Sequence, residues 1–510
     1  MAVLLPIVLL LVLPNLGGYA LWDPDEARHA EVAREVFTAA DWRGWIVPHL
    51  NGHAYHDKPI LHYWLVSAAY ALGGVDERSA RIVSAIAMIA TVLAVYAWSA
   101  ARSGGRGALA AGLVLATSLE FLALGRYASL DMSFTLWMTV GILAAERWAT
   151  TTRRQWALVA GVTAGLGMLT KGLAAPLLIG AAAAGMAWVR GVDRGELGRG
   201  ALSATLAGAV VAGPWYVAAG ILDPTYLRVF LLQHHVGRFL GSAQIALHPK
   251  PVWFYIPVLI GGFMPWTAAL PAAVRAAWKQ PHPDRSFCLT WAAGIFGFFS
   301  LSSGKLGTYI LPCLPPLALV VGPYLADPGE RRWLAGGWWG VIGLCLATVP
   351  ILLGLRVTGL NFVSVGTTLY ALVLDPPAIA AMALLRRGRI DLVPIAIGIG
   401  ILAGSAVFYR VAAPRISAWV SDAQLVRSIP DPTAPVIAYQ IRPASLLFYL
   451  GHPVPVVTKP ARLAEMIEPD RLTFVVTSPK HIPELAAAGT FYPWNTGARH
   501  VLFASQPPPS

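Results

Sequence analysis

The sequence is poor in charged residues, which account for only 13% of its 510 positions. Soluble domains average about 25% charged residues, so a water-soluble globular protein is excluded. The chain also has only three cysteines, Cys288, Cys313 and Cys345, which all lie in apolar runs without a CxxC spacing. This excludes a disulfide framework and a cysteine-based metal or redox motif, and it indicates that the three thiols serve packing.

Three motifs of nucleotide and protease chemistry are absent as well. The chain contains no GxGxxG that opens a helix of a βαβ unit, no Walker A sequence and no HExxH. These absences exclude a nucleotide-driven enzyme and a zincin-type protease. The net charge of +12 does not indicate nucleic-acid binding, because the basic residues lie between apolar runs, where membrane topology accounts for them.

Long apolar runs dominate the sequence, and 56% of its residues are hydrophobic. Runs near 20 residues can cross a bilayer as helices, so we predict an α-helical integral membrane protein with about 13 transmembrane helices. The predicted spans are 2–21, 80–101, 107–124, 132–149, 156–169, 173–188, 201–221, 252–270, 287–302, 308–326, 333–354, 365–385 and 392–409. The first run could also be a cleaved signal peptide, but it lacks a basic n-region and many spans follow, which favours an uncleaved helix.

Basic residues alternate along the connections between these spans. Every second connection is short and basic, as at 102–106, 153–154 and 190–199. By the positive-inside rule these connections face the cytoplasm. The pattern therefore predicts a multi-pass membrane protein with a cytoplasmic N-terminus and with residues 22–79 and the tail on the outer side, which is the periplasm if the source is Gram-negative.

The domain organisation follows from the same pattern. We predict a transmembrane domain at 1–411 and a small C-terminal periplasmic α/β domain at 412–510. The loop 22–79 is too long for a plain connector, and its apolar positions between charges predict periplasmic juxtamembrane helices, the second starting near Pro59. The tail is read as α/β because short β-branched runs bounded by Pro and Gly alternate with helix-like segments.

Charged residues recur at the predicted outer ends of the spans. They are Asp25, Arg28, Asp57, Lys58, Arg126, Asp131, Lys171, Arg238 and Lys305. Ionisable residues at membrane depth are costly and mark a functional site by default, although any single one could snorkel to the interface instead. Arg and Lys bind phosphate, and carboxylates act as bases or stabilise an oxocarbenium-like centre in sugar chemistry. Because the outer face has no ATP, we expect a preactivated donor such as a lipid-phosphate sugar.

The stretch from 21 to 326 contains an ordered series of motifs: "DPDEARHAEVAREV", "DWRGWIVPHLNGHAYHDKPILHYWL", "RYASLDMSFTLW", "LGMLTKG", "LQHHVGRF", "PVWFYIPVLIGGFMPW" and "FFSLSSGKLGTYILPCLPPLAL". Together they resemble the bacterial aminoarabinose transferase (ArnT) family of GT-C glycosyltransferases, which is related to the protein O-mannosyltransferases. The resemblance implies a GT-C fold, a periplasmic active site, a sugar donor on undecaprenyl phosphate and inversion at the anomeric carbon. In the named branch the acceptor is a lipid A phosphate.

The resemblance also implies roles for individual residues. Asp25 and Asp131 would be catalytic, either one acting as the base if the acceptor is a hydroxyl. The donor lipid phosphate would be bound by Arg28, Lys58, Lys171, Arg238, Lys305 and Tyr309. A divalent metal would be held by Asp57 and His235, but here the chain departs from the family. Asp57 stands where a Glu is usual, and His234-His235 stands where Glu-His is common, so the metal, the sugar and the acceptor stay open.

We therefore predict an inverting glycosyltransferase that moves a sugar from undecaprenyl phosphate to a cell-envelope lipid or glycan such as lipid A. Its partners would be the polyprenyl-phosphate sugar, the envelope acceptor and the membrane, with no nucleic acid. A protein O-mannosyltransferase-like enzyme is the alternative. A transporter or flippase is a remote one, because transporters typically contain internal repeats and charges near mid-span, and the sequence has neither feature.

Overall fold

The computed structural model describes residues 1–230, 250–327, 333–340, 342–343, 376–468 and 470–507. The chain separates into two compact units. The first unit comprises Met1–Pro14, His56–His62 and Arg81–Phe408, and the second comprises Asn15–Tyr55, Tyr63–Ala80 and Tyr409–Ser510. Most of the loop 22–79 therefore belongs to the same unit as the C-terminal segment.

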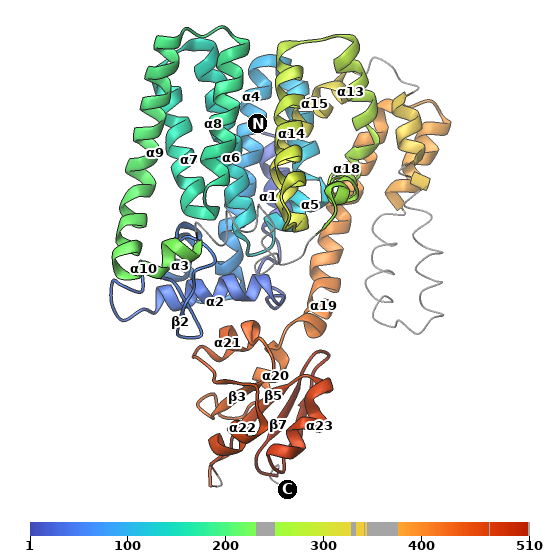
Figure 1. Ribbon diagram of the computed structural model, residues 1–510. Coiled ribbons are helices and arrows are strands. Elements are labelled where there is room, and N and C mark those ends of the chain that lie inside the picture. The colour runs from blue at the N-terminus through green and yellow to red at the C-terminus, as the bar shows by residue number, and fades with distance from the viewer. Residues whose placement is uncertain (231–249, 328–332, 341, 344–375, 469, 508–510) are drawn as a thin grey trace. The chain divides into compact units, whose positions relative to one another are not determined.

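The first unit is helical (Figure 1). Its α-helices are α1 (Leu4–Val12), α4 (Glu77–Ala116, which starts in the second unit), α5 (Leu119–Gly125), α6 (Leu130–Thr151), α7 (Arg154–Lys171), α8 (Ala174–Val189), α9 (Arg194–Leu222), α10 (Pro224–Leu227), α12 (Tyr255–Gly262), α13 (Leu270–Lys279), α14 (Pro283–Leu301), α15 (Leu314–Ala326) and α18 (Val393–Val407). Short 3₁₀ helices join them at η2 (Val252–Phe254), η3 (Trp266–Ala268), η4 (Gly307–Cys313) and η5 (Ile390–Leu392).

Several of these helices can cross a membrane. Among the described residues, 4 helices are long and apolar enough to do so, or up to 6 if each of two bent pairs is one span. The 4 helices are Glu77–Ala116, Arg194–Leu222, Gly307–Ala326 and Ile390–Val420. Much of the predicted spans 333–354 and 365–385 lies outside the described residues, so the count of about 13 stays a prediction, while a helical membrane protein is confirmed.

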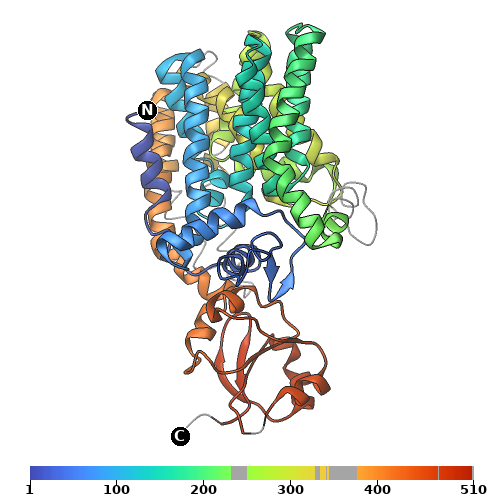
Figure 2. The same ribbon diagram turned by 90° about the vertical axis from the view of Figure 1, so that its left-hand side faces the viewer.

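Helices α6 to α9 pack side by side through small residues (Figures 1 and 2). A Cβ built on Gly161 of α7 would lie 2.1 Å from the backbone oxygen of Ala204 on α9. One turn on, a Cβ on Gly165 would lie 2.9 Å from the backbone oxygen of Gly208. Helix association in membranes favours such small-residue contacts, because they let two backbones approach closely. Gly161 and Gly165 are therefore part of the surface through which α7 packs against α9.

Three predicted spans differ from the structure in shape. The predicted span 252–270 is bent by 110° between Gly262 and Trp266, where Pro265 cannot supply a backbone N–H to a continuing helix. The predicted span 107–124 is interrupted between α4 and α5, and α5 meets α6 at 116°. The predicted span 2–21 is helical only as α1, which ends at Val12 ahead of Pro14 and of Asn15 at φ 58°.

The second unit begins with α2 (Asp25–Phe37), a hairpin of β1 (His49–Leu50) and β2 (His53–Ala54), and α3 (Leu61–Gly73, whose first two residues belong to the first unit). Two helices thus lie within 22–79, while their place at the periplasmic surface of the membrane stays a prediction. The hairpin turns at Asn51 and Gly52, both with positive φ, which is the Asn-Gly signature of a two-residue turn. The Glu35 carboxylate accepts hydrogen bonds from the N–H groups of Asn51 at 2.5 Å and Gly52 at 3.1 Å, and so fastens the hairpin to α2.

The C-terminal part of the second unit contains a five-stranded sheet of order β4-β3-β5-β7-β6 (Figure 2). Strands β4, β3 and β5 are parallel, while β7 is antiparallel to both β5 and β6. The elements are η6 (Phe408–Ala412), α19 (Ala413–Val420), α20 (Ala423–Arg427), β3 (Val436–Tyr439), α21 (Ala444–Leu450), β4 (Val456–Val457), α22 (Pro460–Met466), β5 (Phe474–Thr477), η7 (Pro479–His481), α23 (Ile482–Leu485), η8 (Ala486–Ala488), β6 (Tyr492–Thr496) and β7 (Val501–Ala504). Successive side chains of a strand point to opposite faces of a sheet. The buried strand residues therefore pack alternately into two apolar clusters, one on each face.

Candidate active site

Asp131 and Lys171, two predicted site residues of the first unit, form an ion pair. The Lys171 ammonium donates to Asp131 Oδ1, and the two side chains are only 9% and 11% exposed respectively. Ser129, the N-cap of α6, donates from its hydroxyl to Asp131 Oδ2 at 2.9 Å and accepts from the Asp131 N–H at 3.1 Å. The carboxylate is therefore held at the start of α6 by groups from α6 and α7, with its charge compensated by Lys171.

Aromatic and polar groups surround this pair. The Lys171 Nζ lies 4.2 Å from the ring centroid of Tyr309 and 5.3 Å from that of Phe134, both within cation–π range. Asp131, Lys171 and Tyr309, three of the predicted site residues, are thus neighbours in one cluster of the first unit.

His62 is a neighbour of this cluster that the sequence reasoning missed. Its side chain is fully buried in the first unit, and burial lowers its pKa to about 4 against the opposing attraction of Asp131. The imidazole is therefore neutral at neutral pH. The available signal was its place four positions after Lys58 in "HDKPILHYW".

Lys58 lies in a half-buried turn of the first unit, and its backbone is held from two sides. The Tyr226 hydroxyl on α10 donates to the Lys58 carbonyl at 2.6 Å. Two residues earlier, His56 Nε2 lies 2.5 Å from Asp223 Oδ2 at the end of α9. Burial acts to raise the pKa of Asp223, but hydrogen bonds from Thr225 and His56 outweigh it and lower the pKa below its ordinary value. Asp223 and Tyr226 were also not predicted.

Lys305 and Arg126 donate to backbone carbonyls. The Lys305 ammonium donates to the carbonyl of Lys250 at 3.1 Å and to that of Ser302. Arg126, grouped with the site charges in the sequence, is 2% exposed and donates to the carbonyls of residues 11, 12 and 14 at 2.8, 2.8 and 2.5 Å. These carbonyls end α1, where a cation stabilises the helix terminus, so the structure gives Arg126 a structural role.

In the second unit, Asp25 and Arg28 form an ion pair within the first turn of α2. The side chains remain partly exposed, at 47% for Asp25 and 30% for Arg28. Asp25 is the first residue of α2, where an acidic side chain is favoured by the helix dipole. The predicted neighbours Asp25 and Arg28 are therefore brought together, with a carboxylate that solvent can reach.

The predicted phosphate contact Arg238 and the predicted metal ligand His235 lie outside the described residues. Asp57, the other predicted ligand, is half-buried in the turn before Lys58. Within the part of the chain that the structure describes, no group of three or more His, Cys, Asp or Glu side chains could hold a metal ion. The metal site thus stays a prediction.

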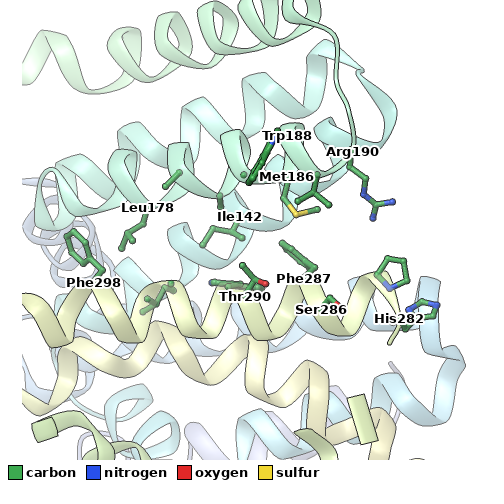
Figure 3. Close-up of a pocket in the computed structure, with 18 of the residues that line it drawn as sticks. Ile142, Leu178, Met186, Trp188, Arg190, His282, Ser286, Phe287, Thr290 and Phe298 are labelled. Atoms are coloured by element: carbon green, nitrogen blue, oxygen red, sulfur yellow. The ribbon is translucent and has the colours of Figure 1, made fainter. Parts of the chain in front are cut away.

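An apolar groove of about 930 Å³ runs between α8 and α14 in the first unit (Figure 3). Leu178 and Trp188 of α8 face Phe287 and Phe298 of α14 across it. Its volume is near the upper end of the roughly 300–1,000 Å³ typical of ligand pockets. A long space lined by such side chains can hold an aliphatic chain.

The fold defines the class of protein to which these helices and this site belong. The structure superimposes on the crystal structure of ArnT from Cupriavidus metallidurans bound to undecaprenyl phosphate with a TM-score of 0.82, covering 99% of this chain and 97% of that one at 24% identity. The apo-state structure of the same protein gives the same TM-score at 23% identity. The fold is therefore the GT-C fold that the motifs implied.

Sequence comparisons name particular relatives. The undecaprenyl phosphate-alpha-4-amino-4-deoxy-L-arabinose arabinosyl transferase 1 of Sodalis glossinidius is 36% identical over 326 residues, which cover 62% of this chain and 57% of the relative. The corresponding transferase of Pectobacterium carotovorum subsp. carotovorum is 35% identical over 368 residues, covering 68% and 65%. A family model described as dolichyl-phosphate-mannose-protein mannosyltransferase matches residues 57–215. The resemblance to the aminoarabinose transferases is thereby confirmed, although the chain spans only 57% to 65% of the length of these relatives.

Proposed function

We propose that this protein is an inverting glycosyltransferase that moves a sugar from undecaprenyl phosphate to a cell-envelope acceptor such as lipid A. The observation that carries the proposal is the 35% to 36% identity to curated aminoarabinosyl transferases. The family-model match at 57–215 includes four of the proposed site residues, Asp57, Lys58, Asp131 and Lys171. Aminoarabinose is accordingly the first sugar to test.

The reaction assigned to these residues is a single displacement. An acceptor oxygen attacks the anomeric carbon from the face opposite the lipid phosphate, the bond from that carbon to the phosphate oxygen breaks, and the lipid phosphate leaves. Lys58, Arg238 and Tyr309 stabilise the charge that develops on the leaving phosphate. Lys171 is proposed to bind the donor phosphate as well. Because its ammonium pairs with Asp131, it also compensates the charge of that carboxylate.

The two carboxylates have different roles according to the acceptor. A hydroxyl acceptor must lose its proton, and Asp25 or Asp131 would take it. A phosphate acceptor is already anionic, so a carboxylate would orient the acceptor instead. Arg28 steadies Asp25, its ion-pair partner, and Lys305 adds to the donor contacts. Asp57 and His235 remain the proposed ligands if a divalent metal takes part.

We further propose that the apolar groove between α8 and α14 holds the lipid chain of the donor. Its aliphatic and aromatic lining supports this assignment. The proposed setting is a bacterial inner membrane with a cytoplasmic N-terminus, a transmembrane domain at 1–411 and a periplasmic C-terminal domain at 412–510. The five-stranded sheet in residues 436–504 supports the α/β class of the latter.

The function is tested with purified protein in detergent and a panel of undecaprenyl-phosphate sugars, namely aminoarabinose, mannose, galacturonate and galactosamine. We expect transfer of one donor's sugar to a lipid A acceptor, with product identified by mass spectrometry. A dominant polypeptide acceptor would instead place the activity with the protein O-mannosyltransferases, toward which the family-model match points. No binding or turnover of any donor would refute the proposal.

A further inference from the structure

The segment His56–Lys58 contains the lysine proposed to bind the donor phosphate, and two groups from the end of α9 and from α10 hold it in place. Asp223 follows the last residue of α9 and is the N-cap of α10. Its Oδ1 accepts from the Thr225 N–H at 3.0 Å and from the Thr225 hydroxyl at 2.5 Å, while its Oδ2 lies 2.5 Å from His56 Nε2. Both carboxylate oxygens are therefore engaged, so the carboxylate has little freedom to rotate.

Tyr226 provides the second attachment. Its hydroxyl donates to the Lys58 carbonyl at 2.6 Å, and its ring packs edge-on against His56 at 5.3 Å between centroids. On its other side the Tyr226 ring packs edge-on against Trp215 of α9 at 5.4 Å. Tyr226 is fully buried, so the side chain that fixes the Lys58 backbone is itself held by α9, the helix that precedes it.

We propose that His56, Asp223 and Tyr226 are positioning residues that hold Lys58 at the angle from which it binds the donor phosphate. The proposal rests on the proposed function, because Lys58 matters to the donor only if the donor carries a phosphate. None of the three residues need touch the donor. The lysine side chain rotates about several bonds, so the position of its ammonium also depends on where its backbone lies. Fixing the backbone limits these positions and removes part of the entropy that donor binding would otherwise cost.

Tyr226→Phe is the sharpest variant, because it removes one hydrogen bond and keeps the buried ring. A lost hydrogen bond of ordinary strength corresponds to about a three- to tenfold change in an equilibrium constant. We expect the KM for the polyprenyl-phosphate sugar to rise by that factor, together with a fall in kcat, because Lys58 also stabilises the departing phosphate. Tyr216→Phe is the matched control: Tyr216 is also buried against Trp215 and donates to a backbone carbonyl, that of Met168 at 3.0 Å, away from the 56–58 segment.

His56 offers a rescue test. His56→Ala removes the link to Asp223, and we expect it to raise the donor KM at least as much as Tyr226→Phe does. His56→Gln places an amide N–H near the position of Nε2, so we expect it to recover most of the affinity. If His56 served general packing alone, the donor KM of His56→Gln would be no better than that of His56→Ala.

Hydrogen exchange of the peptide 54–62, followed by mass spectrometry, provides a readout that does not depend on activity. Faster exchange in Tyr226→Phe than in Tyr216→Phe, together with the raised donor KM, would support the proposal. Unchanged exchange, or faster exchange with an unchanged KM, would overturn it. A wild-type protein that binds no undecaprenyl phosphate would overturn the function itself and this role with it, and that failure is visible without any variant.

Discussion

The ion pair between Asp131 and Lys171 allows a prediction that separates a catalytic role from a structural one. Both side chains are about nine-tenths buried, and removing one partner of a buried pair costs about 3–5 kcal/mol, because the other charge is left uncompensated. We therefore expect Lys171→Met to lower stability by that order. Asp131→Asn should cost less, because the amide oxygen still accepts from Lys171 and the amide N–H can donate to the Ser129 hydroxyl in place of Oδ2.

The double variant Asp131→Asn/Lys171→Met removes both charges. We expect its stability to return most of the way to wild type, since replacing a whole buried pair by neutral groups is often close to neutral. Its transferase activity should remain lost, because the carboxylate and the ammonium are both proposed to act on the substrates. Stability is followed by thermal unfolding in detergent, and activity by turnover of the polyprenyl-phosphate sugar per folded molecule.

The pair formed by Arg102 and Glu146 is a matched control in the same unit. Its Nη2–Oε2 distance is 2.7 Å and its side chains are 17% and 2% exposed. We expect Arg102→Met to lose stability like Lys171→Met but to keep full turnover when folded. Recovered activity in the Asp131/Lys171 double variant, or an equal loss of turnover in Arg102→Met, would refute the catalytic reading of the pair.

Three further predictions concern Arg126 at the C-terminal end of α1, Asp23 in the second unit, and the apolar groove between α8 and α14. Arg126→Met leaves three backbone carbonyls without their buried cation, so we expect a lower unfolding temperature of the purified protein with unchanged donor KM, and a lowered turnover per folded molecule would contradict the capping role. The Asp23 carboxylate is 3% exposed, and burial raises its pKa from 3.8 to about 6. Between pH 3.8 and about 6 the folded protein therefore keeps a proton that the unfolded chain has released. The stabilisation of the folded state by protonated Asp23 is largest below pH 4, and about 3 kcal/mol of it is lost as the pH rises through 6. Unfolding measured from pH 4 to 7 should show this slope in wild type relative to Asp23→Asn, and parallel curves would contradict it. Gly294 lines the groove and Gly297 of the same helix does not, and a Cβ at either position meets no atom within 4 Å. Gly294→Phe should raise the KM of an eleven-isoprene donor more than that of a short-chain analogue, whereas equal effects in Gly294→Phe and Gly297→Phe would rule out the groove as the site of the lipid chain.

Local patterns in the sequence predicted the elements that depend on local forces. The charged and apolar spacing within 22–79 predicted the helix that is α2. The Asn51-Gly52 turn between β1 and β2 was not predicted, although it is a local signal of the same kind. Bends were missed because an average of hydropathy over a window is insensitive to a single Pro265 or to paired glycines. The short α1 was missed for the same reason, since Pro14 is only one position in an apolar run.

The site could be predicted only as a set of residues. Grouping charges by the expected outer ends of spans put Asp131 and Lys171 together, although they are 40 positions apart. The same grouping also included Arg126, whose carbonyl partners become visible only in three dimensions. The His56–Asp223 link joins residues 167 positions apart, and a buried neutral group such as His62 has no charge pattern to reveal it.

The most direct test of the proposed function is a donor turnover assay with the purified protein, comparing wild type with Lys58→Ala and Asp25→Ala. We predict that wild type releases undecaprenyl phosphate from one polyprenyl-phosphate sugar and transfers that sugar to lipid A, and that both variants lose this activity while remaining folded. Full turnover in both variants would contradict the assigned site. A wild-type protein that neither binds nor consumes any such donor would contradict the glycosyltransferase function.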